Sequence, residues 1–393
     1  MSAGTDAPDV IDALAGIGAG SDADALRRAR PAARENAQLA HTALFVPTDA
    51  SQVSVIERHT IAAWTAALAG AAATAEPHRR ALAEAAPDVD AALETALPEA
   101  VAIGPYGAYP PGPLSIEDED GPHWTASAPL RATVGGRLAA ALEHAHLLTY
   151  RPRDADRAAL GRLGEAGWSD TGIVTLSQLV SFVHFQLARG RRPACPPGGL
   201  TMPAPAVNTF TQDMLGWAPW LPPLPEEELT DEHYAALVER SRASNPYFRL
   251  LVRDPAILGA RTRADNDIFY NEDAGLGRAE RELAAATASR VNGCLFCASV
   301  HSRFASFHSK RRDDVQRLLD EGIDGAQDPR WTAVIEASAA LTATPPVFGT
   351  AHVRALRDVG LDDLAIADVI HAAAFFNWAN RLMLSLGEPT APQ

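Results

Sequence analysis

Cysteine is scarce in this chain, with three residues among 393. So few cysteines exclude the disulfide-dense class of small secreted proteins. Basic residues are also outnumbered, 34 against 49 acidic ones, and the formal net charge of -15 argues against nucleic acid or an anionic membrane as a partner. No apolar run approaches the roughly 20 residues that span a bilayer. Because Met1–Ala40 also lacks the basic start and apolar core of a secretory signal, we expect a cytoplasmic protein.

Segments with alternating β-branched residues are missing too, which argues against a β-sheet protein. Ala-rich segments instead place apolar residues at positions i, i+3 and i+4, the spacing of an amphipathic helix. These segments are Ala62–Ala75, Ala128–Leu148, Ala279–Arg290, Arg330–Thr342 and Leu364–Leu384. The pattern predicts an all-α fold.

Two of the three cysteines, Cys294 and Cys297, lie close together after Asn292-Gly293, a turn signal. We expect them to open a helix, where the positive end of the helix dipole favours a thiolate. Cys294, Cys297 and His301 stand at positions i, i+3 and i+7, which places them on one helical face. Glu282 precedes the pair by a spacing of Glu-x11-Cys. A dithiol, an imidazole and a carboxylate are the parts of a thiol redox site.

The chemistry of such a site needs each of these groups. A thiol attacks a peroxide only as the thiolate, and an ordinary cysteine has a pKa of about 8.5. His301 lies one helical turn beyond Cys297 and is predicted to take its proton, directly or through a water. Glu282 is predicted to orient His301 or to accept the proton in turn, the usual order of nucleophile, base and orienting group.

Three other interpretations of the motif remain open. Cys294, Cys297 and His301 could hold a structural zinc with Glu282 as a fourth ligand, although the sequence has no second cluster of Cys and His. Glu282 could be a solvated helix residue. The pair of cysteines could also be an inert part of the core.

The sequence contains a duplicated pattern. Gly167–Asp170 and Gly360–Asp363 are separated by 193 residues (360 − 167), and Phe182 and Phe375 keep the same separation. Both segments predict a capped start followed by an amphipathic helix. Farther upstream we align Glu57 with Glu282. The halves then differ in length, and a Pro-, Gly- and acid-rich stretch, Pro98–Ala128, is predicted to be an inserted loop.

Under that alignment the first half lacks the dithiol, because Ala69 and Ala72 occupy the cysteine positions. We therefore expect three parts. Residues 1–190 form a first repeat without the cysteine pair, residues 191–231 form a Pro-rich linker, and residues 232–393 form a second repeat with the complete motif. The aromatic residues of the linker suggest that it packs on a surface. The third cysteine, Cys195, lies in the linker and is interpreted as an incidental thiol.

The spacing Glu-x11-Cys-x2-Cys-x3-His, formed by Glu282, Cys294, Cys297 and His301, resembles the active-site motif of the alkylhydroperoxidase AhpD family within the carboxymuconolactone decarboxylase-like superfamily. The resemblance extends over roughly residues 30–190 and 230–390. It implies a bundle of helices in each repeat. One position departs from some members: Phe296 stands where they have a second histidine between the cysteines.

The resemblance implies a thiol peroxidase that reduces organic hydroperoxides. By analogy, Cys297 attacks the peroxide and Cys294 resolves the product to a disulfide. The electron donor is then a dithiol reductant such as a dihydrolipoyl carrier, and two-repeat relatives form trimers. The sequence has no Gly-x-Gly-x-x-Gly fingerprint after a strand, so no flavin or nicotinamide cofactor is expected and electrons should come from a partner.

Two further functions compete with the peroxidase interpretation. The first is a carboxymuconolactone decarboxylase-like lyase, although such members generally do without a redox cysteine pair. The second is a non-catalytic redox-sensing or assembly protein. A count of free thiols before and after peroxide separates inert from reactive cysteines, and turnover with a dithiol separates a sensor from an enzyme.

Overall fold

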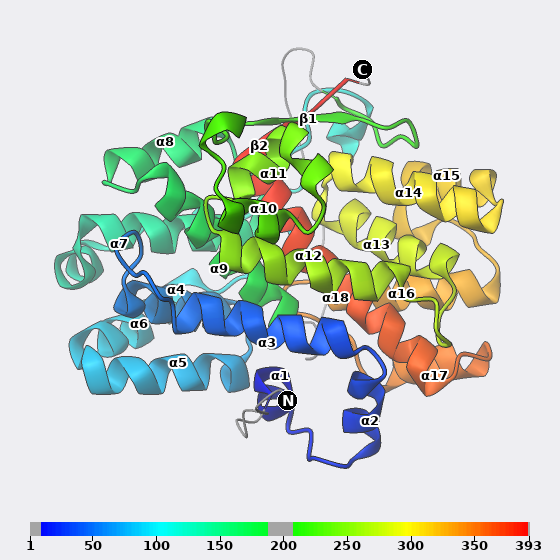
Figure 1. Ribbon diagram of the computed structural model, residues 1–393, viewed down its shortest axis with the longest axis horizontal. Coiled ribbons are helices and arrows are strands. Elements are labelled where there is room, and N and C mark those ends of the chain that lie inside the picture. The colour runs from blue at the N-terminus through cyan, green and yellow to red at the C-terminus, as the bar shows by residue number, and fades with distance from the viewer. Residues whose placement is uncertain (1–8, 188–206, 392–393) are drawn as a thin grey trace.

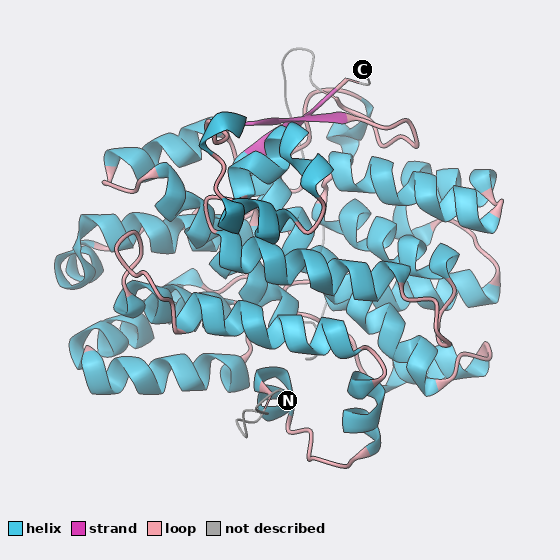
Figure 2. Ribbon diagram, in the orientation of Figure 1, coloured by secondary structure: helices cyan, strands magenta, loops and turns pink. Residues whose placement is uncertain are grey.

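The chain is almost entirely helical in a computed structural model that describes residues 9–187 and 207–391 (Figures 1 and 2). The predicted all-α class is confirmed. Within those ranges the sheet structure is limited to β1 (Gly216–Pro219) and β2 (Gly387–Thr390), which pair antiparallel with Gly216 opposite Thr390. No described helix is long and apolar enough to cross a membrane. Cys195 lies outside the described residues.

The helices before residue 188 lie mainly on the left of Figure 1. They are α1 (Val10–Ala15), α2 (Asp22–Arg28), α3 (Pro31–Phe45), α4 (Val55–Leu68), α5 (Ala72–Ala85), α6 (Pro87–Ala100), α7 (Ala128–Tyr150), α8 (Arg157–Glu165) and α9 (Asp170–Leu187), with short 3-10 turns η1 (Pro113–Glu117) and η2 (Pro152–Asp154).

The helices after residue 206 include α13 to α17, which lie on the right of the same view. They are α10 (Asp231–Leu237), α11 (Pro246–Leu251), α12 (Pro255–Tyr270), α13 (Arg278–Asn292), α14 (Leu295–Ser309), α15 (Arg312–Glu321), α16 (Pro329–Thr342), α17 (Thr350–Asp358) and α18 (Asp363–Leu386), with 3-10 turns η3 (Glu226–Glu228), η4 (Arg240–Ser244) and η5 (Gly322–Asp324).

Three of the five predicted helical segments lie within single helices, Ala128–Leu148 lies within α7 but is kinked at Gly135 (φ 80°), and the fifth, Ala62–Ala75, is wrong. The chain there forms two helices, because α4 ends at Leu68 and α5 begins at Ala72. Gly70 adopts a φ of 69° in the turn between them. This left-handed conformation suits glycine and ends a helix. The Ala-rich composition hid the break, since the residues on both sides of Gly70 favour helix equally.

The predicted starts of the two long matching helices are confirmed. Helices α9 and α18 begin at Asp170 and Asp363, and each follows a glycine with positive φ, Gly167 at 93° and Gly360 at 85°. Both helices are largely buried, which explains their apolar composition.

The two halves of the described chain share one core. Helix α3 packs against α12, and α9 packs against α18. At the second contact the Trp378 ring meets Phe182 edge-to-face at 5.0 Å, and its Nε1 donates to Gln178 Oε1 at 2.9 Å. Arg30, just before α3, forms a buried ion pair with Asp368 of α18 at 2.8 Å. These contacts fix the halves relative to each other.

The predicted inserted loop covers the second half of the molecule. It begins after Ala100, so Pro98–Ala100 belong to α6 and not to the loop. The Glu117 carboxylate accepts two hydrogen bonds from Arg290 of α13, each of 2.7 Å. The guanidinium of Arg290 also lies 4.4 Å from the Phe210 ring centroid. Phe210 therefore packs against the second half, as expected for the aromatic residues of the linker.

Candidate active site

The two cysteines lie where α13 turns into α14. Helix α13 ends at Asn292, and Gly293, with a φ of 75°, reverses the chain. Cys294 is the N-cap residue of α14, and Cys297 lies in the first turn of that helix. Both are buried free thiols. The prediction that the pair opens a helix is confirmed, so the helix dipole acts on both sulfur atoms in the direction that favours a thiolate.

Glu282 and His301 form a direct pair within electrostatic range of Cys297. Glu282 Oε2 lies 2.5 Å from His301 Nδ1, and Oε1 of the same carboxylate accepts from Arg278 Nε at 2.5 Å. Glu282 is 0% exposed, so the alternative of a solvated residue is wrong. Burial pushes the pKa of Glu282 up, but His301 and Arg278 outweigh it and leave the pKa below its ordinary value. The carboxylate is therefore ionised and only accepts hydrogen bonds.

This pairing determines the state of the imidazole. A carboxylate that only accepts requires a proton on His301 Nδ1. Burial acts to lower the pKa of His301, yet the charge of Glu282 raises it above the ordinary value. The ring is held edge-to-face by Phe376, with centroids 4.1 Å apart, and packs on Phe269. His301 is thus a fixed and basic group on the helical face of the thiols.

The two thiols differ in acidity. Burial raises the pKa of the Cys294 thiol well above its usual range, and the neighbouring Cys297 adds to the effect. Burial acts on Cys297 in the same direction, but a hydrogen bond with Cys294 and the charge of His301 bring its pKa below the ordinary value. Cys297 is therefore the more acidic thiol of the pair, and Cys294 is the one that donates to it.

Several neighbours of the dithiol were not found from the sequence. The Asn380 amide hydrogen-bonds to Cys297, and Arg261 adds positive charge near it. Asp265 and Tyr247 also lie within electrostatic range of the site, and burial raises the pKa of both, that of Tyr247 to about 12. These four residues lie on three helices, with Tyr247 on α11, Arg261 and Asp265 on α12, and Asn380 on α18. No local spacing in the sequence connects them with the motif. Within the described chain, no group of three or more Cys, His, Asp or Glu side chains could hold a metal ion.

A cavity of about 220 Å³ opens beside Cys294. The turn residue Gly293 lines it together with residues of the first half that include Tyr109 and Arg153. A Cβ on Gly293 would overlap the Cγ and Cδ atoms of Arg153, so glycine is required at the turn for a second reason. Much of the remaining wall is apolar and includes Trp217, Trp220, Phe296 and Met383.

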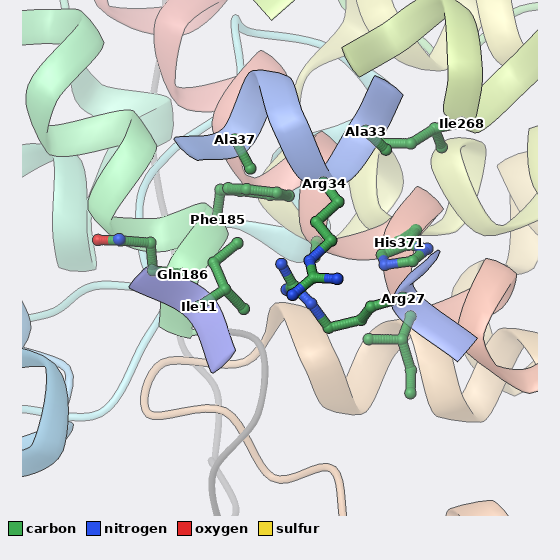
Figure 3. Close-up of a pocket in the computed structure, with 11 residues that line it drawn as sticks. Ile11, Arg27, Ala33, Arg34, Ala37, Phe185, Gln186, Ile268 and His371 are labelled. Atoms are coloured by element: carbon green, nitrogen blue, oxygen red, sulfur yellow. The ribbon is translucent and has the colours of Figure 1, made fainter. Parts of the chain in front are cut away.

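Figure 3 shows another cavity, away from the dithiol, where Arg27, Arg34 and His371 lie between helices of both halves. Its volume is about 20 Å³, which is close to the space of one water. None of the four predicted site residues lines it. Of the four, Cys294 lines the cavity of about 220 Å³, which therefore reaches the motif at that residue.

Residues 255–340 match the model of the Carboxymuconolactone decarboxylase family. This segment belongs to that family. It contains Glu282, Cys294, Cys297 and His301, so all four predicted site residues lie within it. No curated protein matches the chain.

Two solved structures are similar to parts of the chain. One is described as the alkylhydroperoxidase AhpD core of an uncharacterized peroxidase-related protein from Ralstonia eutropha JMP134, with 20% identity, a TM-score of 0.37, and coverage of 42% of this chain and 88% of that one. The other is an uncharacterized peroxidase-related protein from Silicibacter sp. TM1040, with 24% identity, a TM-score of 0.32, and coverage of 46% and 91%.

Outside the carboxymuconolactone decarboxylase family segment, the first half repeats a contact of the second. Arg58 Nε donates to the carbonyl five residues before it, that of Val53, at 2.9 Å. Arg281 Nε donates in the same way to Leu276 at 2.6 Å. The two arginines are separated by 223 residues (281 − 58), and Gly70 and Gly293, both left-handed turn residues, keep that separation.

Our alignment of Glu57 with Glu282 is therefore wrong by two residues. It followed residue identity, whereas the contacts match Glu57 with Glu280, since each pairs with an arginine of a neighbouring helix. The separation of 223 residues places the following first-half residues opposite Glu282, Cys294, Cys297 and His301: His59, Ala71, Thr74 and His78.

The first half thus contains a pair of histidines where the family segment has Glu282 and His301. The Nδ1 atoms of His59 and His78 lie 3.0 Å apart, so one donates to the other. Burial lowers the pKa of His78 to about 3, and burial also lowers that of nearby His41 to about 4. These rings are neutral near pH 7. With Ala71 and Thr74 in the cysteine positions, this part of the first half has no thiol chemistry.

Proposed function

We propose that the protein is a thiol-dependent peroxidase of the alkylhydroperoxidase type, acting on organic hydroperoxides. The observation that supports this most directly is the pairing of a buried, ionised Glu282 with His301, on the same helical face as a thiol of lowered pKa. A nucleophile, a base and an orienting carboxylate in hydrogen-bond sequence are what nucleophilic thiol chemistry requires.

In the proposed cycle the Cys297 thiolate attacks one peroxide oxygen and the O–O bond breaks. Cys297 becomes a sulfenic acid, and the second oxygen leaves as an alcohol after taking a proton. The Cys294 sulfur then attacks the Cys297 sulfur and expels water, which forms a Cys294–Cys297 disulfide. A dithiol reductant such as a dihydrolipoyl carrier restores both thiols and becomes a disulfide itself.

Peroxide consumption with dihydrolipoamide as the electron donor tests this proposal. The wild-type protein should turn over an organic hydroperoxide such as cumene hydroperoxide, and Cys297→Ser and Cys294→Ser should each abolish turnover. Cys297→Ser should in addition abolish the first oxidation, whereas Cys294→Ser should still form a sulfenic acid. If peroxide oxidises neither thiol in the folded protein, the proposal fails. Oxidation without turnover would instead support the redox-sensing alternative.

A lyase remains the second candidate, because the matching family is named for a decarboxylase. One variant without either cysteine distinguishes the peroxidase from the lyase. A lyase that uses His301 and Glu282 for proton transfer should keep its activity on carboxymuconolactone in the Cys294→Ser, Cys297→Ser double variant, whereas peroxidase activity should disappear.

A second proposal concerns the organisation of the chain into repeats. We propose two helical repeats, residues 1–190 and 232–393, joined by the linker at residues 191–231, with the redox site in the second repeat alone. The matching contacts of Arg58 and Arg281 support the duplication.

We also propose a cytoplasmic homo-trimer. Light scattering that gives the 41.6 kDa monomer mass at micromolar concentration would contradict the trimer.

A further inference from the structure

The cavity beside Cys294 combines apolar walls with one cation. Trp217 and Trp220 come from the linker, Phe296 from α14 and Met383 from α18. The first half adds Arg153, from the short η2 turn after α7. At about 220 Å³ the cavity is smaller than the roughly 300–1,000 Å³ typical of sites for drug-sized ligands, so it suits a short chain.

Arg153 has no carboxylate partner within ion-pair distance in residues 9–187 and 207–391. Its Nη1 and Nη2 atoms donate to the backbone carbonyls of Glu117 and Pro105, at 3.4 and 3.2 Å. Its guanidinium lies 4.8 Å from the Tyr109 ring centroid, and its Nε is buried without a hydrogen-bond partner. The guanidinium therefore has polar and aromatic contacts but no ion-pair partner, although the whole chain has a net charge of -15.

The two acidic residues that line the cavity have other contacts. Asp156 caps α8 by accepting a hydrogen bond from the Ala159 N–H at 2.7 Å. Glu388 is half-exposed and lies 3.9 Å from Arg157, a residue outside the cavity wall. Neither carboxylate is close enough to neutralise Arg153, so an anion entering the cavity would gain its charge-assisted hydrogen bonds.

From this arrangement we propose that the cavity binds a short apolar acid, with its carboxylate on Arg153 and its chain against the apolar wall that includes Trp217 and Trp220. The position of Arg153 over Gly293, the residue before Cys294, puts the anion site next to the dithiol. The proposed binding of an acid does not depend on the peroxidase proposal, but the role of the bound acid rests on the proposed peroxidase cycle. The acid could be the hydroperoxide or the thiol reductant.

Binding is tested with octanoate and octanol, followed by the fluorescence of the tryptophans in the wall. Octanoate should bind at least about tenfold more tightly than octanol, the scale of a charge-assisted hydrogen bond. Arg153→Gln should remove this preference, and Arg153→Lys should keep part of it, since a lysine keeps the charge without the planar fork. Arg157→Gln, which changes an exposed arginine on the adjacent helix, should bind like the wild type.

A second variant tests the cavity without touching the arginine. Ala155 lines the same space, and Ala155→Phe should fill it and weaken binding of octanoate and octanol alike. Equal affinity for octanoate and octanol in the wild-type protein would overturn the proposal. So would octanoate binding that survives both Arg153→Gln and Ala155→Phe in variants with wild-type circular dichroism.

The two half-reactions then distinguish the sources of the acid. Reduction of the oxidised protein is compared for dihydrolipoate and the neutral dihydrolipoamide, and oxidation of the reduced protein for a short-chain hydroperoxy acid and its methyl ester. We expect the preference for the acid in the reduction step. Cys294 lines the cavity, so a reductant thiolate bound there can attack the Cys294 sulfur of the disulfide and expel the Cys297 thiolate. An Arg153-dependent preference in oxidation would assign the acid to the hydroperoxide. If peroxide oxidises neither thiol while octanoate still binds through Arg153, the peroxidase proposal fails and the binding site stands.

Discussion

His301 Nδ1 lies 2.5 Å from Glu282 Oε2, in a buried pair that joins α14 to α13. Because Arg278 occupies the other oxygen of that carboxylate, the pair has one defined arrangement. It leaves Nε2 as the ring nitrogen available for the thiol. The acidity of Cys297 therefore depends on a carboxylate twelve residues before the cysteine pair.

Replacement of His301 by glutamine should slow oxidation of Cys297 by roughly 10²–10⁴-fold at neutral pH, the usual scale for loss of a general base. The charge of His301 lowers the pKa of Cys297, so the variant should have a higher thiol pKa. The loss should shrink as the pH rises toward the pKa of a free thiol, because hydroxide then forms the thiolate. Stopped-flow oxidation and alkylation rates at several pH values measure both effects.

The matched control for that variant is Glu57→Gln. Glu57 caps α4 and pairs with Arg137 at 2.8 Å, far from the thiols in sequence and outside the family segment. It should leave the oxidation rate unchanged and lower the free energy of unfolding by less than about 1 kcal/mol, because glutamine can still form the capping box and only a partly exposed ion pair is lost. If Glu57→Gln abolished activity while His301→Gln spared it, the roles assigned here would be wrong.

Peroxide should convert Cys294 and Cys297 into a reversible disulfide. Cysteines at positions i and i+3 around the start of a helix reach disulfide distance with little backbone movement. Mass spectrometry should show the loss of two hydrogens on the peptide that contains both residues, and dithiothreitol should restore them. Overoxidation of Cys297 alone, or a bridge to Cys195, would count against this expectation.

The histidines of the first half should make stability fall on acidification. The pKa of His78 is about 3 in the folded protein and 6.5 in an ordinary environment, so between these values the unfolded chain binds a proton that the folded chain does not. The contribution of neutral His78 to the free energy of unfolding is complete above pH 6.5. Below that pH it decreases by about 1.4 kcal/mol per pH unit. His78→Gln should reduce the slope by about that amount in urea unfolding between pH 4.5 and 6. An unchanged slope would mean that His78 is already protonated in the folded state.

The inserted loop should stabilise the second half through Glu117. Glu117→Gln leaves the mostly buried Arg290 without a charged partner, and the free energy of unfolding should fall by about 1–2 kcal/mol, given that Glu117 is partly exposed. The comparison is Glu76→Gln, which breaks the exposed pair with Arg80 and should cost less than about 0.5 kcal/mol. Equal effects in urea unfolding would show that the loop contact adds nothing beyond a surface ion pair.

The sequence by itself determined the features that depend on neighbouring residues. Apolar spacing determined the long helices, and the capping residues Ser169 and Asp362 determined where two of them start. The turn at Gly293 and the spacing from Cys294 to Cys297 determined that the thiols open a helix. These features follow from local backbone preference and helical periodicity, which a single sequence displays.

Tertiary structure decided which distant residues meet. Only packing showed that His59, and not Glu57, lies in the position of Glu282. The alignment of the two halves by residue identity paired the two glutamates, and the matching contacts of Arg58 and Arg281 corrected it. Only packing brought Arg153 over Gly293, across 140 residues of chain (293 − 153). Such contacts form where helix faces and loops cover one another, and no local spacing in the sequence records them.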